Sequence, residues 1–301
     1  MGWARFRNSR PVEGSVKQIT IAQDGGRWLV SLTTELEKAL PAGDEIVAAD
    51  RGVRDTLALS NEQRIAPLDA HKSALHRLRR YQRSVSRKIE AQKRAMGLDP
   101  EASFPKGVHP PKSNRQRLAE RRVARCHHQV ANQRRDWLHK LTTILANDSA
   151  VIVLEDLQTK AMTGSAKGTT ETPGKKVRQK AGLNRSILDQ GWCLLEAMLS
   201  YKLAWRDGQL IKVPAPYTSQ RCSACGHIDA ASRKDKKFIC TACGHAEDAD
   251  INAAKNILAA GLAVLSGNTH ARHVLVEDAA LSGRPLKREP PIAEGGVSCA
   301  V

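Results

Sequence analysis

Long apolar runs, aromatic side chains and cysteines are all scarce in this chain of 301 residues. No apolar run approaches the roughly 20 residues that a membrane-spanning helix needs. Aromatic residues make up only 4% of the chain, and its basic segments lack the bulky face of a helix that lies on a membrane. Seven cysteines do not make a disulfide-rich secreted domain. We therefore expect no membrane partner and a location in the reducing cytoplasm.

Acidic residues are also few in comparison with basic ones. The chain has 31 Asp and Glu against 48 Lys and Arg, which gives a formal net charge of +17. Such an excess favours a polyanionic partner, and nucleic acid is the partner that it indicates. The length allows one large domain with a buried core and a smaller second one.

Four of the cysteines form two Cys-x-x-Cys pairs, Cys222 with Cys225 and Cys240 with Cys243. Two such pairs can hold one zinc ion tetrahedrally, and a glycine follows each pair where a tight turn needs a positive φ. The 14 residues between the pairs are close to the spacing of a zinc ribbon. Two disulfides are the alternative, which the composition disfavours. The sequence therefore predicts a structural zinc site. The remaining cysteines are expected to be ordinary thiols: Cys126, Cys193 and Cys299.

Several short segments have the alternation or the apolar content of β-strands. Residues 16–36 predict a β-hairpin. Two apolar runs end on a carboxylate, residues 46–50 on Asp50 and residues 150–155 on Glu155. Further strands are expected at residues 56–60 and 210–213.

Two long basic helices are predicted over residues 71–94 and 114–147, separated by a loop rich in proline and glycine. The first carries Lys or Arg at positions 72, 77, 79, 80, 83, 87, 88, 93 and 94, against the single acid Glu90. A solvated charged face is the alternative, but such a face usually mixes both signs of charge. We therefore expect this helical hairpin to face nucleic acid.

The rest of the chain combines loops and apolar helices. Residues 159–182 are rich in glycine, threonine and lysine and predict a mobile loop that contacts substrate. One amphipathic helix is expected from Leu188 to Leu203, and another, rich in small residues, over residues 251–265. Residues 267–301 have no sustained pattern and are expected to be a disordered tail.

Asp50, Glu155 and Asp250 are candidate catalytic acids because of their positions, two at strand ends and one at the start of a helix. Carboxylates at strand ends of an α/β sheet can converge on one edge, where three of them can hold Mg²⁺ or Mn²⁺. Two such ions activate water in phosphodiester hydrolysis. A single acid is more often a strand-end or cap residue, so the prediction depends on the whole set.

Asp248 is an alternative to Asp250 as the third catalytic acid. Two residues on a helix turn through about 200°, so the two carboxylates cannot share a face. Asp248 precedes the helical pattern, where we expect it to cap the helix, whereas Asp250 lies over the small residues Ala253 and Ala254. We therefore assign the catalytic role to Asp250.

Five stretches together resemble the TnpB family, which comprises transposon-encoded RNA-guided DNA nucleases also named OrfB-type transposases and similar to type V CRISPR effectors. The resemblance covers roughly residues 1–265 and is most specific around the cysteines. Arg51 departs from the family pattern, which usually has an apolar residue there. The matching stretches are Ile46-Val-Ala-Ala-Asp50-Arg-Gly52, Val151-Ile-Val-Leu-Glu155-Asp-Leu157, Asn184-Arg-Ser-Ile-Leu-Asp-Gln-Gly-Trp192, Tyr217-Thr-Ser-Gln-Arg-Cys-Ser-Ala-Cys-Gly226 and Asp248-Ala-Asp-Ile-Asn-Ala-Ala-Lys-Asn-Ile257.

The resemblance implies an α/β fold: an RNase H-like (RuvC) nuclease domain with a basic helical hairpin and an inserted zinc ribbon, preceded by a partial β-rich wedge domain. By matching positions, Asp50, Glu155 and Asp250 would be the metal-binding catalytic acids, and the four paired cysteines the zinc ligands. Met1 would correspond to the middle of the wedge domain. We then expect the earlier wedge strands and the helical recognition domain, which hold guide RNA and read flanking DNA, to be missing. The implied domains are a partial wedge at 1–40, a nuclease domain at 41–221 with a helical insertion at 71–148, a zinc ribbon at 222–244, and the end of the nuclease domain at 245–266.

The sequence thus predicts a metal-dependent DNA endonuclease of mobile-element origin, RNA-guided in its full-length relatives. Its partners would be DNA and a guide RNA, and its cofactors Zn²⁺ together with Mg²⁺ or Mn²⁺. A non-cleaving, nucleic-acid-binding remnant is one alternative, because N-terminal parts are expected to be missing. A transposase that joins DNA strands is another, because it would use the same acids. The three tyrosines provide no tyrosine-recombinase constellation.

Overall fold

The computed structural model describes residues 3, 5–8, 11–24, 27–37, 40–214 and 216–267. The predicted tail beyond residue 267, with Cys299, lies outside these residues. The chain divides into two compact units, Met1–Leu40 with Ala70–Gln133 and Pro41–Asp69 with Arg134–Val301. Within the described part of the chain, no helix combines the length and the apolar content needed to cross a membrane.

The first unit contains the predicted hairpin and most of the two predicted basic helices. β1 (Ser15–Asp24) and β2 (Arg27–Glu35) pair antiparallel, which confirms the hairpin. α1 (Ala70–Ala95) and α2 (Asn114–Asp148) confirm the helices. A narrow apolar stripe joins the helices of this unit, while the basic residues lie outside it. The buried members of the stripe are Ala70, Ala74, Leu78, Cys126 and Val130.

The second unit is built on one mixed sheet with the strand order β5-β4-β3-β6-β7. β3 pairs parallel with β6, and β6 with β7, whereas β4 and β5 are antiparallel additions. The predicted strands are confirmed, and β5 is an extra strand of two residues, too short for a pattern. The strands are β3 (Glu45–Arg51), β4 (Leu57–Leu59), β5 (Arg64–Ile65), β6 (Ser149–Glu155) and β7 (Gln209–Val213).

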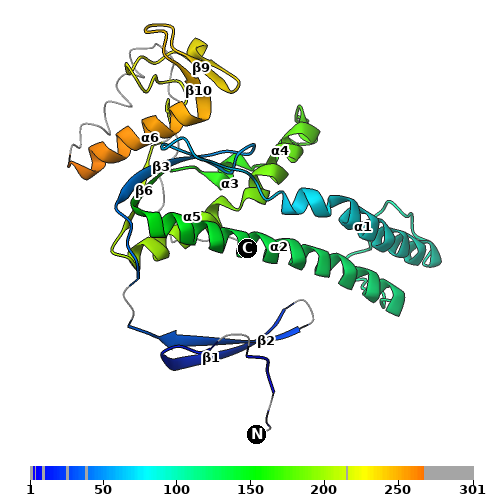
Figure 1. Ribbon diagram of the computed structural model, residues 1–301. Coiled ribbons are helices and arrows are strands. Elements are labelled where there is room, and N and C mark those ends of the chain that lie inside the picture. The colour runs from blue at the N-terminus through cyan, green and yellow to red at the C-terminus, as the bar shows by residue number, and fades with distance from the viewer. Residues whose placement is uncertain are drawn as a thin grey trace. The chain divides into compact units, whose positions relative to one another are not determined.

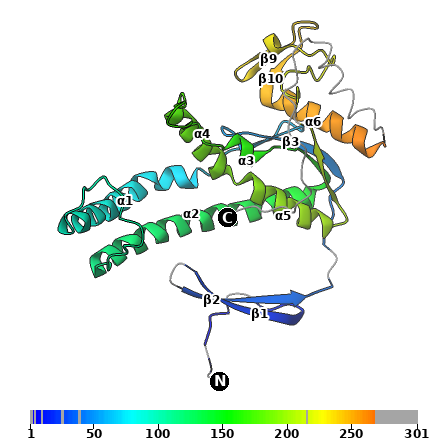
Figure 2. The same ribbon diagram turned by 180° about the vertical axis from the view of Figure 1, so that it is seen from behind.

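Helices cover both faces of this sheet (Figure 1, and from behind Figure 2). α6 (Ala249–Leu265) packs on one face around Ala48 and Val153. α5 (Trp192–Ala204) and residues 134–148 of α2 pack on the other, around residues that include Ala49 and Leu154. Because strand side chains alternate between faces, the residues after Ala49 and Leu154, namely Asp50 and Glu155, face α6. The alternation therefore brings two of the predicted acids to the side of the helix that carries the third.

The approach of α6 to the sheet requires a glycine at position 261. A Cβ placed on Gly261 would lie 2.4 Å from Cγ2 of Val153, well inside van der Waals contact. The helix therefore lies closely against β6, and its N-terminal end is near the ends of β3 and β6.

Two predictions between residues 159 and 204 were wrong. The single helix expected from Leu188 is two helices, α4 (Val177–Gln190) and α5, because Gly191 between them has a φ of 69° that ends the first helix. The stretch 159–182, expected to be one loop, contains α3 (Thr159–Met162) and the start of α4. The apolar spacing continues through Gly191, so the sequence pattern gave no sign of the break.

Candidate metal centre and acid pocket

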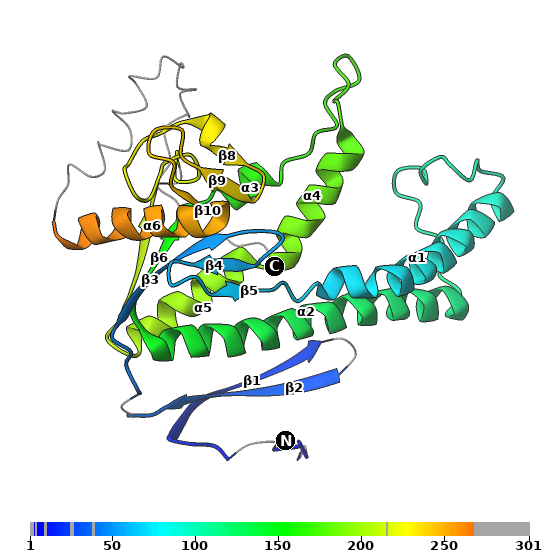
Figure 3. The ribbon, with the colours of Figure 1, turned by 45° about the horizontal axis from the view of Figure 1, so that its top comes forward.

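The four paired cysteines converge on one point in a small module, residues 222–248, that precedes α6. Its strands β8 (Arg233–Lys234), β9 (Lys237–Ile239) and β10 (Ala246–Asp248) form an antiparallel sheet in the order β10-β9-β8 (Figure 3). Phe238 is fully buried and packs with Cys222 and Cys240 in a very small core. Such a core cannot hold the module together by hydrophobic burial alone.

Two identical backbone turns present the sulfur atoms. Cys222 accepts a hydrogen bond from the amide of Gly226 at 2.9 Å, and Cys240 accepts one from Gly244 at 3.0 Å. The glycines have φ values of 77° and 74°, which other residues adopt with strain. The Gly226 and Gly244 positions therefore have the backbone role that the sequence indicated.

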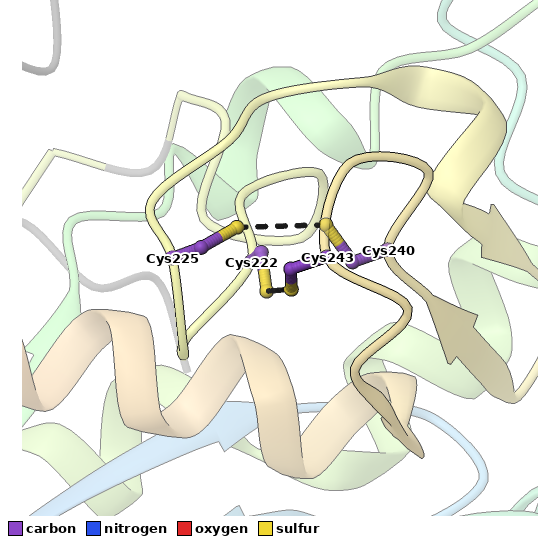
Figure 4. Close-up of side chains that lie close together, drawn as sticks. All are labelled: Cys222, Cys225, Cys240 and Cys243. Atoms are coloured by element: carbon purple, nitrogen blue, oxygen red, sulfur yellow. Dashed lines mark hydrogen bonds between the residues drawn. The ribbon is translucent and has the colours of Figure 1, made fainter.

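The sulfur atoms are spaced for a metal and not for disulfides. Cys222 and Cys243 have their Sγ atoms 3.8 Å apart, and Cys225 and Cys240 3.6 Å apart (Figure 4). A disulfide is about 2.05 Å long, whereas a tetrahedron with zinc–sulfur bonds of about 2.3 Å has edges of about 3.8 Å. Backbone amides, first that of Cys243, lower the pKa of the Cys240 thiol to about 6, which favours the thiolate that binds metal. The disulfide alternative is therefore wrong for these cysteines.

The three candidate acids line one pocket of about 510 Å³ on the α6 face of the sheet. Asp50 comes from the end of β3, Glu155 from the end of β6 and Asp250 from the first turn of α6. The structure thus brings together three residues that are up to 200 positions apart in the sequence, as the strand-end argument predicted.

Asp50 has the most perturbed carboxyl group of the pocket. Burial is the largest cause, followed by the negative charges of Glu155 and Asp250, and together they raise its pKa from 3.8 to about 7. Arg233 and Arg51 oppose this shift only in part. A carboxylate held between two others in a buried site is stabilised by any cation that binds there.

Glu155 is buried and is held by a hydroxyl group. Burial raises its pKa, and the hydrogen bond that Thr218 donates to Oε1 at 2.5 Å opposes the rise. Thr218 lies in the loop between β7 and the four-cysteine module, so sequence periodicity gave no reason to select it. Its neighbour in the sequence motif, Tyr217, has a φ of 66°, unusual for a residue other than glycine.

Asp250 and Asp248 lie in different surroundings, and the predicted N-cap role of Asp248 is confirmed. Asp248 is the N-cap of α6, and its Oδ1 accepts hydrogen bonds from the amides of Asp250 at 3.0 Å and Ile251 at 3.3 Å. Arg64 adds an ion pair to Asp248 at 2.5 Å. Asp250 instead lines the pocket and pairs with Arg233 of β8 at 2.9 Å. No pattern in the sequence indicates Arg233, whose place in the pocket depends on the folded module.

Arg51, the departure from the family pattern, lies on the opposite face of β3 from Asp50. Its guanidinium group is buried, donates to the main-chain oxygen of Glu155 and pairs with Glu196 of α5 at 3.3 Å. It lies 6.0 Å from the ring centre of Trp192. Arg51, which also lines the pocket, therefore supplies a fixed positive charge close to the acids.

The donor set of the pocket suits hard divalent cations. Three carboxylates without sulfur or imidazole are the ligands that Mg²⁺ and Mn²⁺ prefer. Among the described residues, the four cysteines are the one group of three or more potential ligands whose atoms all lie within 4.8 Å of one another. The acids are spaced more widely, with Arg233 and Thr218 bound to two of them.

Two family models match the chain. The family described as "Probable transposase" matches residues 29–166, and the one described as "Cas12f1-like, TNB domain" matches residues 192–257. The second match contains all four cysteines and Asp250, and the first contains Asp50 and Glu155.

Two relatives carry the name "Putative RNA-guided DNA endonuclease". The one from Escherichia coli K12, InsQ, is 41% identical over 96% of this chain, and the one from Streptomyces pristinaespiralis is 31% identical over 97%. The chain spans 65% of the length of each. Among solved structures, a Cas12f1 complex with single guide RNA and target DNA aligns with 77% of this chain and 42% of its own, at 18% identity and a TM-score of 0.47.

The similarity to these relatives runs through almost the whole chain, and the two matched models include both ligand sets. Four of the five motif stretches lie within the matched regions, and of the stretch 184–192 only Trp192 does. The chain belongs to the TnpB family, the OrfB-type proteins of insertion sequences.

Proposed function

We propose that this chain carries a metal-dependent DNA endonuclease site of the RNase H-like (RuvC) type, formed by Asp50, Glu155 and Asp250. The observation that supports this most strongly is the convergence of the three acids on one pocket from β3, β6 and α6. The names of the two relatives support the same activity and suggest that an RNA guides it.

The residues of the pocket have complementary tasks in phosphodiester hydrolysis. Mg²⁺ or Mn²⁺, when bound, would activate water and stabilise the leaving oxygen. Asp50, Glu155 and Asp250 would hold the cations, and Thr218 would orient Glu155. Arg233 and Lys236, which also line the pocket, would attract the phosphates of the substrate.

The four cysteines would hold one structural Zn²⁺. The sulfur spacing supports this assignment, and the lack of a large core in the module makes the metal its main source of stability. Because β10 leads directly into α6, the zinc would also fix the start of the helix that carries Asp250.

Nucleic acid would bind along the basic helices of the first unit. Arg80, Arg83 and Arg87 line a hollow on α1 with Lys88. On α2, Arg117, Arg121 and Arg125 are exposed at intervals of four residues, which places them on one side of the helix. We assign both rows to phosphate contacts with DNA or with a guide RNA.

A non-cleaving nucleic-acid-binding protein is the second candidate. It is favoured by one observation: the basic helical surfaces belong to a different compact unit from the acid pocket, so binding does not depend on the acids. A transposase is a third outcome to test, because strand joining would use the same three carboxylates.

A cleavage assay distinguishes these functions. The full chain, with and without RNA transcribed from its flanking sequence, is incubated with labelled DNA and Mn²⁺. Cleavage that disappears in Asp50→Ala, Glu155→Ala and Asp250→Ala supports the endonuclease. Asp156→Asn is the matched control, because this exposed acid follows Glu155 and pairs with Lys212 outside the pocket. DNA binding without cleavage would support the binding protein, and joined strands would support the transposase.

A further inference from the structure

Two asparagines of α6 are buried on the side of the helix that meets the loop after β7. Asn252 is 0% exposed and Asn256 is 7% exposed, and they lie one turn apart. A buried amide without hydrogen bonds costs about 1–3 kcal/mol, so such side chains need specific partners. Neither asparagine lines the acid pocket.

Both asparagines bind the main chain of one loop. Asn252 donates to the carbonyl of Arg221 at 2.7 Å and accepts from the amide of Ser223 at 2.9 Å. Asn256 donates to the carbonyls of Arg221 at 2.7 Å and Thr218 at 2.9 Å. These four hydrogen bonds join α6 to residues 218–223, the segment that leads from the loop after β7 into the four-cysteine module.

The same loop holds Glu155. Thr218 is 3% exposed, and its hydroxyl donates to Oε1 of Glu155 while its carbonyl accepts from Asn256. The loop begins at Tyr217, whose left-handed conformation costs roughly 1–2 kcal/mol and persists only where surrounding contacts hold it. The asparagines therefore help to hold this loop against α6.

We propose that Asn252, Asn256 and Thr218 are positioning residues that fix the carboxylate of Glu155 relative to Asp250. Asp250 lies one half-turn before Asn252 on the same helix, so the distance between these two acids is set through a rigid chain of contacts. The proposal rests on the proposed function, because it explains how two of the proposed metal-binding acids are kept at a fixed distance from each other. Outer hydrogen bonds of this kind typically contribute 10–100-fold to metal affinity.

Mn²⁺ affinity tests the proposal without relying on cleavage. The titration is made by calorimetry on the full chain, with its zinc retained, at a single pH. Thr218→Val keeps the side-chain volume and removes the hydroxyl, and we expect it to weaken Mn²⁺ binding about 10–100-fold. Thr218→Ser restores the hydroxyl and should restore most of the affinity. Asn256→Ala should weaken binding in the same way, and the double variant with Thr218→Val should be no weaker than the worse single variant.

Asn147→Ala is the control for a general loss of stability. Asn147 accepts hydrogen bonds from Arg206 at 2.8 and 3.0 Å in the same unit and does not line the pocket. Its replacement should lower the melting temperature and leave the Mn²⁺ affinity unchanged. Wild-type affinity in Thr218→Val and Asn256→Ala, with Asp50→Ala unable to bind, would overturn this proposal and leave the proposed function in place. Equal binding by wild type and Asp50→Ala would overturn both. Since the Thr218 variants keep the loop main chain intact, they decide the question even if Asn256→Ala does not fold.

Discussion

The four-cysteine module and the acid pocket are assembled in opposite ways. The cysteines come from one segment of 22 residues, Cys222 to Cys243, in which two backbone turns and a small sheet bring the sulfur atoms together. The acids come from two strands and a helix, and each depends on partners from elsewhere, such as Arg233 for Asp250 and Thr218 for Glu155. Local spacing therefore determines the first site, whereas packing of the whole second unit determines the other. Changes in packing should disturb the acid pocket long before they disturb the cysteines.

The largest effect is expected from the two aspartates that differ by two positions. Asp250→Ala should reduce cleavage to background with the fold intact, because it removes a carboxylate from the pocket. Asp248→Ala should cost about 0.5–2 kcal/mol of stability through removal of the cap, and still cut. Parallel cleavage and thermal denaturation measurements separate the two. If Asp248→Ala did not cleave DNA and Asp250→Ala still did, the catalytic role would belong to Asp248 instead.

The next largest effect should follow removal of the proposed zinc. Cys222→Ser or Cys240→Ser should reduce zinc from one ion per chain to none and open residues 222–248 to proteases, because the module has little core to replace the metal. Cys193→Ser, at an exposed cysteine away from the module, is the matched control. Elemental analysis of freshly purified protein gives the stoichiometry. No zinc in the wild type would contradict the assignment.

A smaller effect concerns the pH dependence of stability in the metal-free pocket. Asp50 has a pKa of about 7 in the folded protein and 3.8 when unperturbed, so between these values the folded state retains a proton that the unfolded state has released. The metal-free protein should therefore lose stability as the pH rises from about 4 to 7. Asp50→Asn removes this dependence and should stabilise the protein at pH 8 by on the order of 1–4 kcal/mol, with little change at pH 4.

Denaturation at the two pH values, in buffer without magnesium or manganese and with zinc retained, measures this effect. An equal gain at both pH values would mean that Asn packs better there and that charge repulsion is not the cause.

The smallest effect per residue is expected on the basic helices. Reversing the charge of Arg83 or Arg87 should weaken nucleic-acid binding. It should also lower the slope of log affinity against log salt by about one for each phosphate that the variant no longer neutralises. Lys140→Glu is a control. Lys140 pairs with Asp136 in the C-terminal part of α2, which belongs to the second unit. Binding that does not depend on salt between about 50 and 200 mM would place the nucleic acid elsewhere.

Elements that one local pattern determines could be predicted from the sequence. The helical stripe of α1, the alternation of the hairpin and the N-cap role of Asp248 are all set by neighbouring residues. The convergence of Asp50, Glu155 and Asp250 could be inferred only because strand ends of a sheet meet at one edge.

Features that depend on long-range contacts could not be predicted. The role of Gly191 depends on its backbone conformation, and the apolar spacing around it continues as in one helix. Thr218, Arg233 and Asn256 are polar residues whose importance appears only when a loop, a module and a helix meet. Candidate ligands could therefore be predicted from the sequence, whereas the residues that contact them could not.

Anomalous diffraction from crystals of the full chain grown with Mn²⁺ tests the central claim most directly. Data at the manganese and zinc edges separate the two metals by element and position. We predict a manganese peak among the carboxylates of Asp50, Glu155 and Asp250, and a zinc peak among the four cysteines. A fully occupied manganese position elsewhere, with none among these acids, would contradict the claim that they form the metal site.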